Sequence, residues 1–191
     1  VSLFDWQGPV GAGFPAIIQQ GVARSAANID PSWIGRDVRD MFQQACGCPV
    51  TVLNDADAAG LAEMQFGAGQ GRDGVVLLIT LGTGIGTALF SDGYLMPNTE
   101  LGHIEIGGIE AEKMASSFVR ENENLTWPQW ASRVDTYLDT MEQLLWPDLI
   151  IIGGGISKDH KEFLPLLTVE AEVIPAEMRN NAGIIGAALA A

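Results

Sequence analysis

The chain has 191 residues, 47% of them hydrophobic and 18% charged, which is the composition of an ordinary soluble globular protein. Ten basic residues stand against 24 acidic ones, and the formal net charge of −14 argues against general binding to nucleic acid or to anionic membrane surfaces. No run approaches the roughly 20 apolar residues of a membrane-spanning helix, and the N-terminus lacks the basic segment of a secretion signal.

Short apolar runs alternate with helix-like segments along the chain, a pattern that predicts an α/β fold. Strands are predicted at Val10–Phe14, Val50–Leu53, Val75–Leu81, Gly86–Phe90 and Leu149–Ile152. A first helix is predicted over 57–66. Apolar residues at helical spacing predict a longer one that runs from Trp130 toward Pro147, with Thr126 as its N-cap. The small residues of "NAGIIGAALAA" predict a last helix that packs closely against a neighbour.

The two cysteines, Cys46 and Cys48, form a C-x-C pair in "ACGCP". Because there is no second cysteine pair, a structural zinc site is disfavoured and two reduced thiols are expected. Reduced thiols are consistent with the cytoplasm, which is the predicted location of the protein.

The stretch "VTVLNDADAAG" places Asn54 and Asp55 directly after a predicted strand. Ligands of α/β proteins bind at such strand ends, and a carboxylate there can accept a proton from a substrate hydroxyl. Asp57 stands where the N-cap of the following helix is expected, so it needs no further role. Asp55 is not needed for capping and is therefore the predicted functional carboxylate.

The stretch "LLITLGTGIGTALF" alternates Gly82, Gly84 and Gly86 between two apolar runs. It lacks the helix that follows a dinucleotide-binding G-x-G-x-x-G, and no Lys-Ser or Lys-Thr pair completes a P-loop. A tight hairpin turn accounts for some of the glycines. Three alternating glycines exceed what a turn requires, and they predict a loop whose backbone N–H groups and Thr83 hydroxyl hold phosphate oxygens.

The stretch "PNTELGHIEIGGIEAE" gathers many polar acceptors around two glycines, namely Glu100, His103, Glu105, Glu110 and Glu112. Such a group suits a polyol, whose hydroxyls each require an acceptor or a donor. Metal binding is the rival interpretation, although the absence of a nearby second His or Cys disfavours zinc. A single His among acidic residues is also a common feature of protein surfaces.

The stretch "PDLIIIGGGIS" leads a further buried strand into Gly153, Gly154 and Gly155. One such turn is weak evidence for a ligand site. Two glycine-rich turns together with a strand-end Asp are stronger, because each strand end can supply one wall of a cleft.

Taken together, "LNDADAAGLAE", "LITLGTGIGTALF", "PNTELGHIEIGG" and "WPDLIIIGGGIS" resemble the sugar kinases of the ROK family, in particular its polyphosphate-using branch. The stretches "ANIDPSWIG" and "VIPAEMRNNAGIIGAA" extend the resemblance over nearly the whole chain. The resemblance implies an actin-like, ribonuclease-H-like fold with two lobes. It also implies phosphorylation of glucose at its 6-hydroxyl.

In that family the Asp of the "ND" pair is the catalytic base, and it corresponds to Asp55. The resemblance implies that sugar binding falls on Asn28, Asn54, Glu100, His103 and, with a looser alignment, Glu110. It assigns the phosphoryl donor to Gly82, Thr83, Gly84 and Gly86 and to Gly153, Gly154 and Gly155. Mg²⁺ is expected to accompany the donor.

Two departures from the family pattern carry further expectations. Most members have a cysteine-rich zinc motif after the "GH" pair, whereas "IEIGGIEAE" contains no cysteine, so no zinc is expected. The family also begins with a glycine-rich "DxGGTxxK" motif that this sequence lacks, which implies a missing N-terminal segment and an incomplete small lobe. The predicted small lobe is 1–70 plus 182–191, and the predicted large lobe is 71–181.

The sequence therefore leads to the hypothesis of a glucokinase that uses polyphosphate or ATP. The alternative is a non-catalytic sugar-binding or sensor module of that family, either the effector half of a ROK-type repressor or an inactive fragment. Upstream residues distinguish the two, because a kinase requires a glycine-rich hairpin there and a repressor a helix-turn-helix. A homodimer is expected for the full-length protein, without a nucleic-acid or membrane partner.

Overall fold

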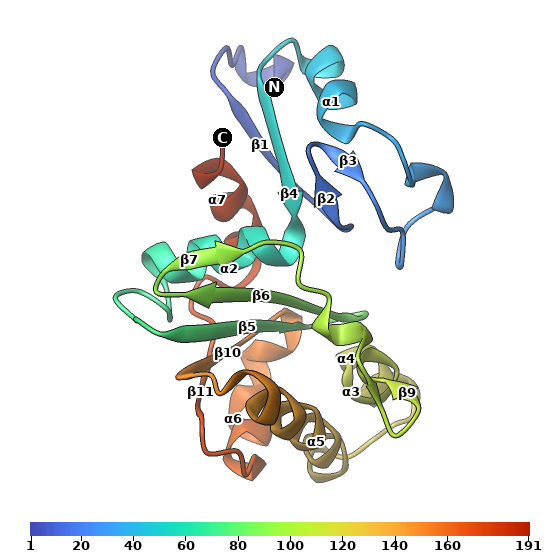
Figure 1. The fold of residues 1–191 in the computed structure, drawn as a ribbon, viewed down its shortest axis with the longest axis vertical. Coiled ribbons are helices and arrows are strands. Elements are labelled where there is room, and N and C mark those ends of the chain that lie inside the picture. The colour runs from blue at the N-terminus through green and yellow to red at the C-terminus, as the bar shows by residue number, and fades with distance from the viewer.

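The structure is a computed structural model that describes residues 1–191 apart from the side chains of Ser2 and Asn180. It has a mixed α/β architecture in which a five-stranded sheet and a two-stranded parallel sheet lie on either side of helices α2 (Asp55–Phe66) and α7 (Ala182–Leu189) (Figure 1). The α/β fold class predicted from the sequence is confirmed.

The five-stranded sheet has the order β11-β10-β5-β6-β7. Its strands are β5 (Val75–Leu81), β6 (Ile85–Ser91), β7 (Tyr94–Met96), β10 (Leu149–Gly153) and β11 (Glu172–Pro175). β10 runs parallel to β5 and β11, while β5, β6 and β7 form an antiparallel meander. The predicted strands at 75–81, 86–90 and 149–152 are confirmed, with ends that differ by at most one residue.

Helix α5 (Trp127–Leu145) covers one face of this sheet. Its Trp130, Tyr137 and Leu138 side chains are fully buried, because the helical spacing of its apolar residues turns one stripe toward the sheet. Thr126 is the N-cap, and its backbone N–H donates to the Gln129 side chain at 3.0 Å in a capping box. The helix thus begins three residues before Trp130, and the predicted N-cap is confirmed.

The two-stranded sheet pairs β1 (Val10–Phe14) in parallel with β4 (Val50–Asn54), as the sequence predicted for both strands. Helix α1 (Val38–Cys46) packs on one face of this sheet, where the rings of Phe14 and Phe42 meet edge to face. The short hairpin of β2 (Ile18–Gln19) and β3 (Val22–Ala23) lies beside it. The thiols of Cys46 and Cys48 are both free.

Helix α7 holds α2 and β1 together through small residues. A Cβ atom on Gly186 would collide with the carbonyl oxygen of Ala58 in α2, and one on Gly11 would collide with that of Ala187. Only glycine at these two positions lets the backbones approach so closely. The predicted close packing of the last helix is confirmed. Because α2 contacts both sheets, the division into the two predicted lobes stays a prediction.

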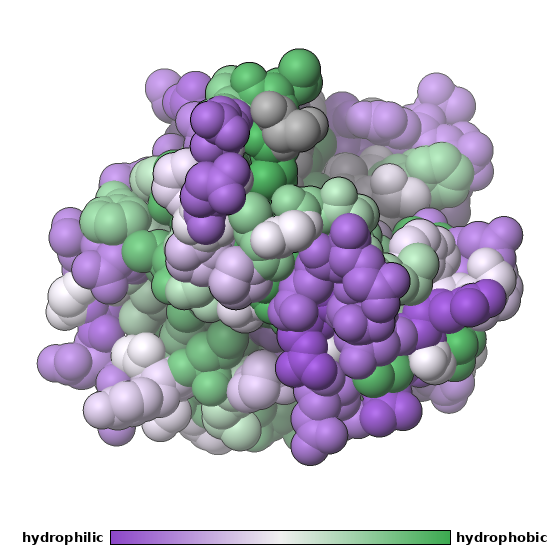
Figure 2. Space-filling view, turned by 90° about the horizontal axis from the view of Figure 1, so that it is seen from above, coloured by the Kyte–Doolittle hydropathy of each residue, from purple (hydrophilic) through white to green (hydrophobic). Residues whose placement is uncertain are grey.

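The remaining elements are short. They comprise β8 (Glu105–Ile106), β9 (Ile109–Glu110), α3 (Ala111–Ala115), α4 (Ser117–Asn122), α6 (His160–Phe163) and several 3₁₀ turns. Within the described residues, no helix has both the length and the apolar character that crossing a membrane requires. Seen from above, the surface carries hydrophilic residues over much of its area, with hydrophobic residues interspersed among them (Figure 2).

Candidate active site

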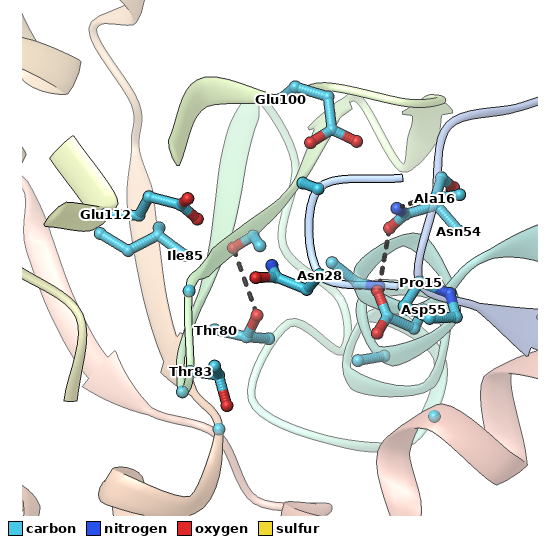
Figure 3. Close-up of a pocket in the computed structure, with 18 of the residues that line it drawn as sticks. Pro15, Ala16, Asn28, Asn54, Asp55, Thr80, Thr83, Ile85, Glu100 and Glu112 are labelled. Atoms are coloured by element: carbon cyan, nitrogen blue, oxygen red, sulfur yellow. Dashed lines mark hydrogen bonds between the residues drawn. The ribbon is translucent and has the colours of Figure 1, made fainter. Parts of the chain in front are cut away.

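A cavity of about 490 Å³ lies where the carboxyl ends of β4, β5 and β10 converge (Figure 3). This is the edge at which α/β sheets bind their ligands. The sequence-predicted residues that line the cavity are Asn28, Asn54, Asp55, Gly82, Thr83, Gly84, Gly86, Glu100, His103 and Gly154. The structure thus brings together residues from five separate stretches of the chain. The predicted Glu110, Gly153 and Gly155 are not among the lining residues.

The junction between β4 and α2 is fixed by Asn54. Its side-chain oxygen caps the helix by accepting hydrogen bonds from the N–H groups of Ala56 (2.8 Å) and Asp57 (3.2 Å). Its amide nitrogen donates to the carbonyl of Ala16 at 3.2 Å, which ties the junction to the segment after β1. The helix therefore begins two residues earlier than predicted, and the expectation that Asp57 is the N-cap is wrong.

Asp55 occupies the first turn of α2, at the positive end of the helix dipole. One of its carboxylate oxygens accepts a hydrogen bond from the Ala56 N–H at 2.9 Å. Partial burial raises the pKa of Asp55, and the hydrogen bond opposes that rise. A carboxylate with a raised pKa at a cavity wall is a stronger base than an exposed one.

Asp57 points away from the cavity and is almost fully buried, with 1% of its surface exposed. One carboxylate oxygen accepts a hydrogen bond from the backbone N–H of Asn98 at 2.8 Å. Burial raises the pKa of Asp57 to about 6, and repulsion from Glu100 and Asp55 acts in the same direction.

Asn98 extends this contact to the opposite wall. Its side-chain oxygen accepts from the Ile18 N–H at 2.7 Å, and its amide donates to the Ile18 carbonyl at 3.0 Å. Asp57 and Asn98 together fix the segment that leads to Glu100 against α2 and β2. The sequence offered no signal for this role of Asp57, since its partner lies 41 residues away along the chain.

Glu100, His103 and Glu112 form a polar cluster at one side of the cavity. The two ring nitrogens of His103 lie 3.6 Å from a Glu100 oxygen and 3.7 Å from a Glu112 oxygen. Burial raises the pKa of Glu100, and the nearby His103 opposes that rise. The carboxylates of Glu100 and Glu112 face the cavity together with the amide of Asn28 (Figure 3).

Glu110 lies beside this cluster but outside the cavity lining, where its carboxylate pairs with Lys113. The hydrogen bond from Lys113 lowers the pKa of Glu110. Sequence reasoning selected Glu110 from this stretch, whereas the structure turns Glu112 toward the cavity. The two residues are only two positions apart, and the start of α3 at Ala111 decides which of them faces inward.

His103, Glu110 and Glu112 each offer one atom that could bind a metal ion, and these atoms lie within 4.8 Å of one another. One imidazole and two carboxylates are ligands that zinc accepts. The expectation that the protein carries no zinc therefore stays a prediction.

The glycine loop between β5 and β6 lines the same cavity, with Gly84 against Glu112 and with Thr80 and Thr83 far from Glu100 (Figure 3). The carbonyl of Gly82 accepts hydrogen bonds from the Phe118 N–H (3.1 Å) and the Ser117 hydroxyl (2.9 Å), which anchors the loop to α4. A Cβ atom on Gly84 would collide with the Glu112 carboxylate, so glycine is needed there for close approach. The loop is thus both a hairpin turn and a cavity wall.

The sequence model of the ROK family matches residues 3–124. The chain is also 50% identical over its whole length to a polyphosphate glucokinase of Mycobacterium tuberculosis, of which it covers 72%. The chain belongs to the ROK family. The resemblance inferred from the sequence motifs is thereby confirmed.

Two solved ROK structures are similar to this chain. An inorganic polyphosphate/ATP-glucomannokinase from Arthrobacter sp. strain KM superposes with a TM-score of 0.92 at 52% identity, covering 95% of this chain and 72% of its own. A ROK family glucokinase from Streptomyces griseus, in complex with glucose and AMPPNP, gives a TM-score of 0.81 at 26% identity, covering 96% and 81%. The predicted actin-like fold class is confirmed by these neighbours.

The raised pKa of Asp57 predicts a specific dependence of stability on pH. The folded protein holds the Asp57 proton up to about pH 6, whereas the unfolded chain releases it near 3.8, so the free energy of unfolding falls as the pH rises between these values. Asp57→Asn removes this contribution. Relative to the variant, the wild type should lose about 2–3 kcal/mol between pH 4 and pH 7. Urea unfolding at several pH values measures this difference, and parallel curves for both proteins would contradict the assignment.

Proposed function

We propose that the protein is a glucokinase that transfers a phosphoryl group from polyphosphate or ATP to the 6-hydroxyl of glucose. The observation that carries this proposal is that Asp55 lines one cavity together with a polar carboxylate-rich wall and a glycine loop at the end of β5. The names of the similar proteins support it, because they are a polyphosphate glucokinase, a polyphosphate/ATP-glucomannokinase and a glucokinase that binds glucose.

The sugar is expected to lie against Glu100, His103, Glu112 and Asn28. Carboxylates accept hydrogen bonds from hydroxyls, and an amide both donates and accepts, so this wall can satisfy several hydroxyls of one sugar ring. Asn54 contributes mainly by holding the wall in place, since its side chain already caps α2 and binds the Ala16 carbonyl. In this proposal Glu112 takes the place that the sequence assigned to Glu110.

Asp55 is proposed as the general base. Its carboxylate would take the proton of the glucose 6-hydroxyl while the hydroxyl oxygen attacks the terminal phosphorus of the donor. The bridging P–O bond of that phosphoryl group would break and release ADP or the polyphosphate shortened by one phosphate. The N-terminus of α2 favours the ionised form of Asp55, while desolvation at the cavity wall raises its pKa and with it its basicity. A base of this kind typically contributes 10²–10⁴-fold to the rate.

The donor is proposed to bind at the glycine loop, where backbone N–H groups and the Thr83 hydroxyl can hold phosphate oxygens. We also propose that Mg²⁺ accompanies the donor. The Thr83 hydroxyl and the Asp55 carboxylate are oxygen ligands of the kind Mg²⁺ takes, and the ion usually binds through substrate phosphates and water as well. When bound, Mg²⁺ neutralises charge on the transferred phosphoryl group.

The general-base proposal predicts the effect of Asp55→Asn in the intact protein. Turnover should fall by about 10²-fold or more, because the amide cannot accept the proton, while the dissociation constant for glucose stays within about twofold. A coupled assay of glucose 6-phosphate and calorimetric titration with glucose measure the two quantities. Asp73→Asn, an exposed residue outside the cavity, is the matched control and should change neither. A near-normal kcat for Asp55→Asn would contradict the assignment.

The choice between Glu112 and Glu110 gives a paired prediction. Glu112→Gln should weaken glucose binding by about 1–3 kcal/mol, because a sugar hydroxyl or His103 loses its acceptor. Glu110→Gln removes a carboxylate that pairs with Lys113 outside the cavity, so it should change the affinity by about twofold at most. Titration of each variant with glucose decides between the residues. A larger loss of glucose affinity in Glu110→Gln than in Glu112→Gln would instead identify Glu110 as the sugar ligand.

A further inference from the structure

The Arg179 side chain is a positive charge at the cavity that has no part in the chemistry described so far. Among the described residues that line it, Arg179 is the one Lys or Arg, whereas Asp55, Glu100 and Glu112 supply three carboxylates. The whole chain carries ten Lys and Arg residues and a net charge of −14. A polyanionic donor that approaches such a chain is repelled unless a local cation offsets the field.

The turn that carries Arg179 lies on the donor side of the cavity. It is the 3₁₀ turn Arg179–Asn181, which precedes α7 and packs beside the turn that begins after Gly154. Ala182 and Gly183, the first residues of α7, line the same wall. Within the described part of the chain, the Arg179 guanidinium forms no ion pair, in contrast to those of Arg72 and Arg133.

The backbone of Arg179 is unusual as well. Its φ angle is +49°, in the left-handed region that residues other than glycine, Asn and Asp seldom adopt. Such a conformation is strained and persists only where the surroundings hold it.

A buried carboxylate holds the two residues directly before Arg179. Glu63, on α2, has none of its surface exposed, and its two oxygens accept hydrogen bonds from three backbone N–H groups. The donors are Ala68 (2.9 Å), Glu177 (3.1 Å) and Met178 (2.7 Å), the last two directly before Arg179. Three such bonds offset the cost of burying a charge. Glu63 thereby fixes the chain that enters the Arg179 turn to the same helix that carries Asp55.

We propose that Arg179 binds phosphate oxygens of the phosphoryl donor and that Glu63 is the positioning residue that sets its place relative to Asp55. The inference rests on the proposed function and adds the donor contact that the glycine loop alone does not supply. A guanidinium presents paired N–H donors that match two phosphate oxygens, so it recognises a phosphate chain by geometry as well as by charge. Helix α2 then positions the proton acceptor Asp55 directly. Through Glu63 it also positions Arg179, the proposed donor clamp.

The test uses inorganic tripolyphosphate as the probe in calorimetric titrations of the intact protein, together with KM values for polyphosphate and for glucose. Arg179→Gln should raise the dissociation constant for tripolyphosphate and the KM for the donor at least about tenfold, with glucose binding changed less than about twofold. Arg179→Lys should retain part of the affinity. Arg72→Gln removes one positive charge from an exposed ion pair outside the cavity and should leave tripolyphosphate binding within about twofold.

The role of Glu63 is tested by comparing the same two quantities, the KM for the donor and the affinity for glucose. Glu63→Gln should raise the donor KM several-fold while the affinity for glucose holds, because an NH2 group, which cannot accept hydrogen bonds, replaces one of the two carboxylate oxygens. Glu63→Asp keeps the charge with a shorter reach and should fall between the wild type and Glu63→Gln. Equal losses for glucose and for the donor in both variants would show a general structural role and overturn the positioning claim.

The outcomes separate this inference from the proposed function. A wild-type protein that phosphorylates glucose, together with an Arg179→Gln variant of unchanged tripolyphosphate affinity, would overturn the role of Arg179 alone. A wild-type protein that binds glucose but neither binds tripolyphosphate nor forms glucose 6-phosphate would overturn the proposed function and, with it, the donor clamp. Because Arg179 is exposed, its replacement removes no core packing, and a folded variant is expected.

Discussion

The cap that Asn54 places on α2 is the constraint on which the site depends. It ends β4, starts the helix and joins both to the segment after β1 through the Ala16 carbonyl. Asp55 consequently has one possible location, in the first helical turn at the edge of the cavity. Without this junction the Asp55 carboxylate could still accept a proton, but it would no longer be held in a fixed position at the cavity.

Helix α2 uses three carboxylates in three different environments. Asp55 lines the cavity, Asp57 is buried against Asn98, and Glu63 is buried beneath the turn that leads to Arg179. Each one is held by backbone N–H groups rather than by a basic side chain, which suits a chain with few Lys and Arg residues. The helix thus connects the sugar wall, the proposed base and the proposed donor clamp, and the glycine contacts with α7 keep it in place.

Much of this arrangement follows from sequence patterns that are local. The apolar strands, the α5 stripe after Thr126 and the strand-end position of Asp55 each depend on neighbouring residues, and the structure has them as predicted. The partner of Asp57 lies 41 residues away, and two of the three partners of Glu63 lie more than 100 residues away, so no local pattern could reveal them. The inward turn of Glu112 rather than Glu110 depends on where α3 begins, which periodicity does not fix to one residue.

The most direct test of the central claim is a crystal structure of the intact protein with glucose bound. The account predicts glucose in the cavity, with its 6-hydroxyl within hydrogen-bond distance of the Asp55 carboxylate and its ring hydroxyls on Glu100, His103 and Glu112. Glucose bound at another place, or bound in the cavity with its 6-hydroxyl directed away from Asp55, would contradict it.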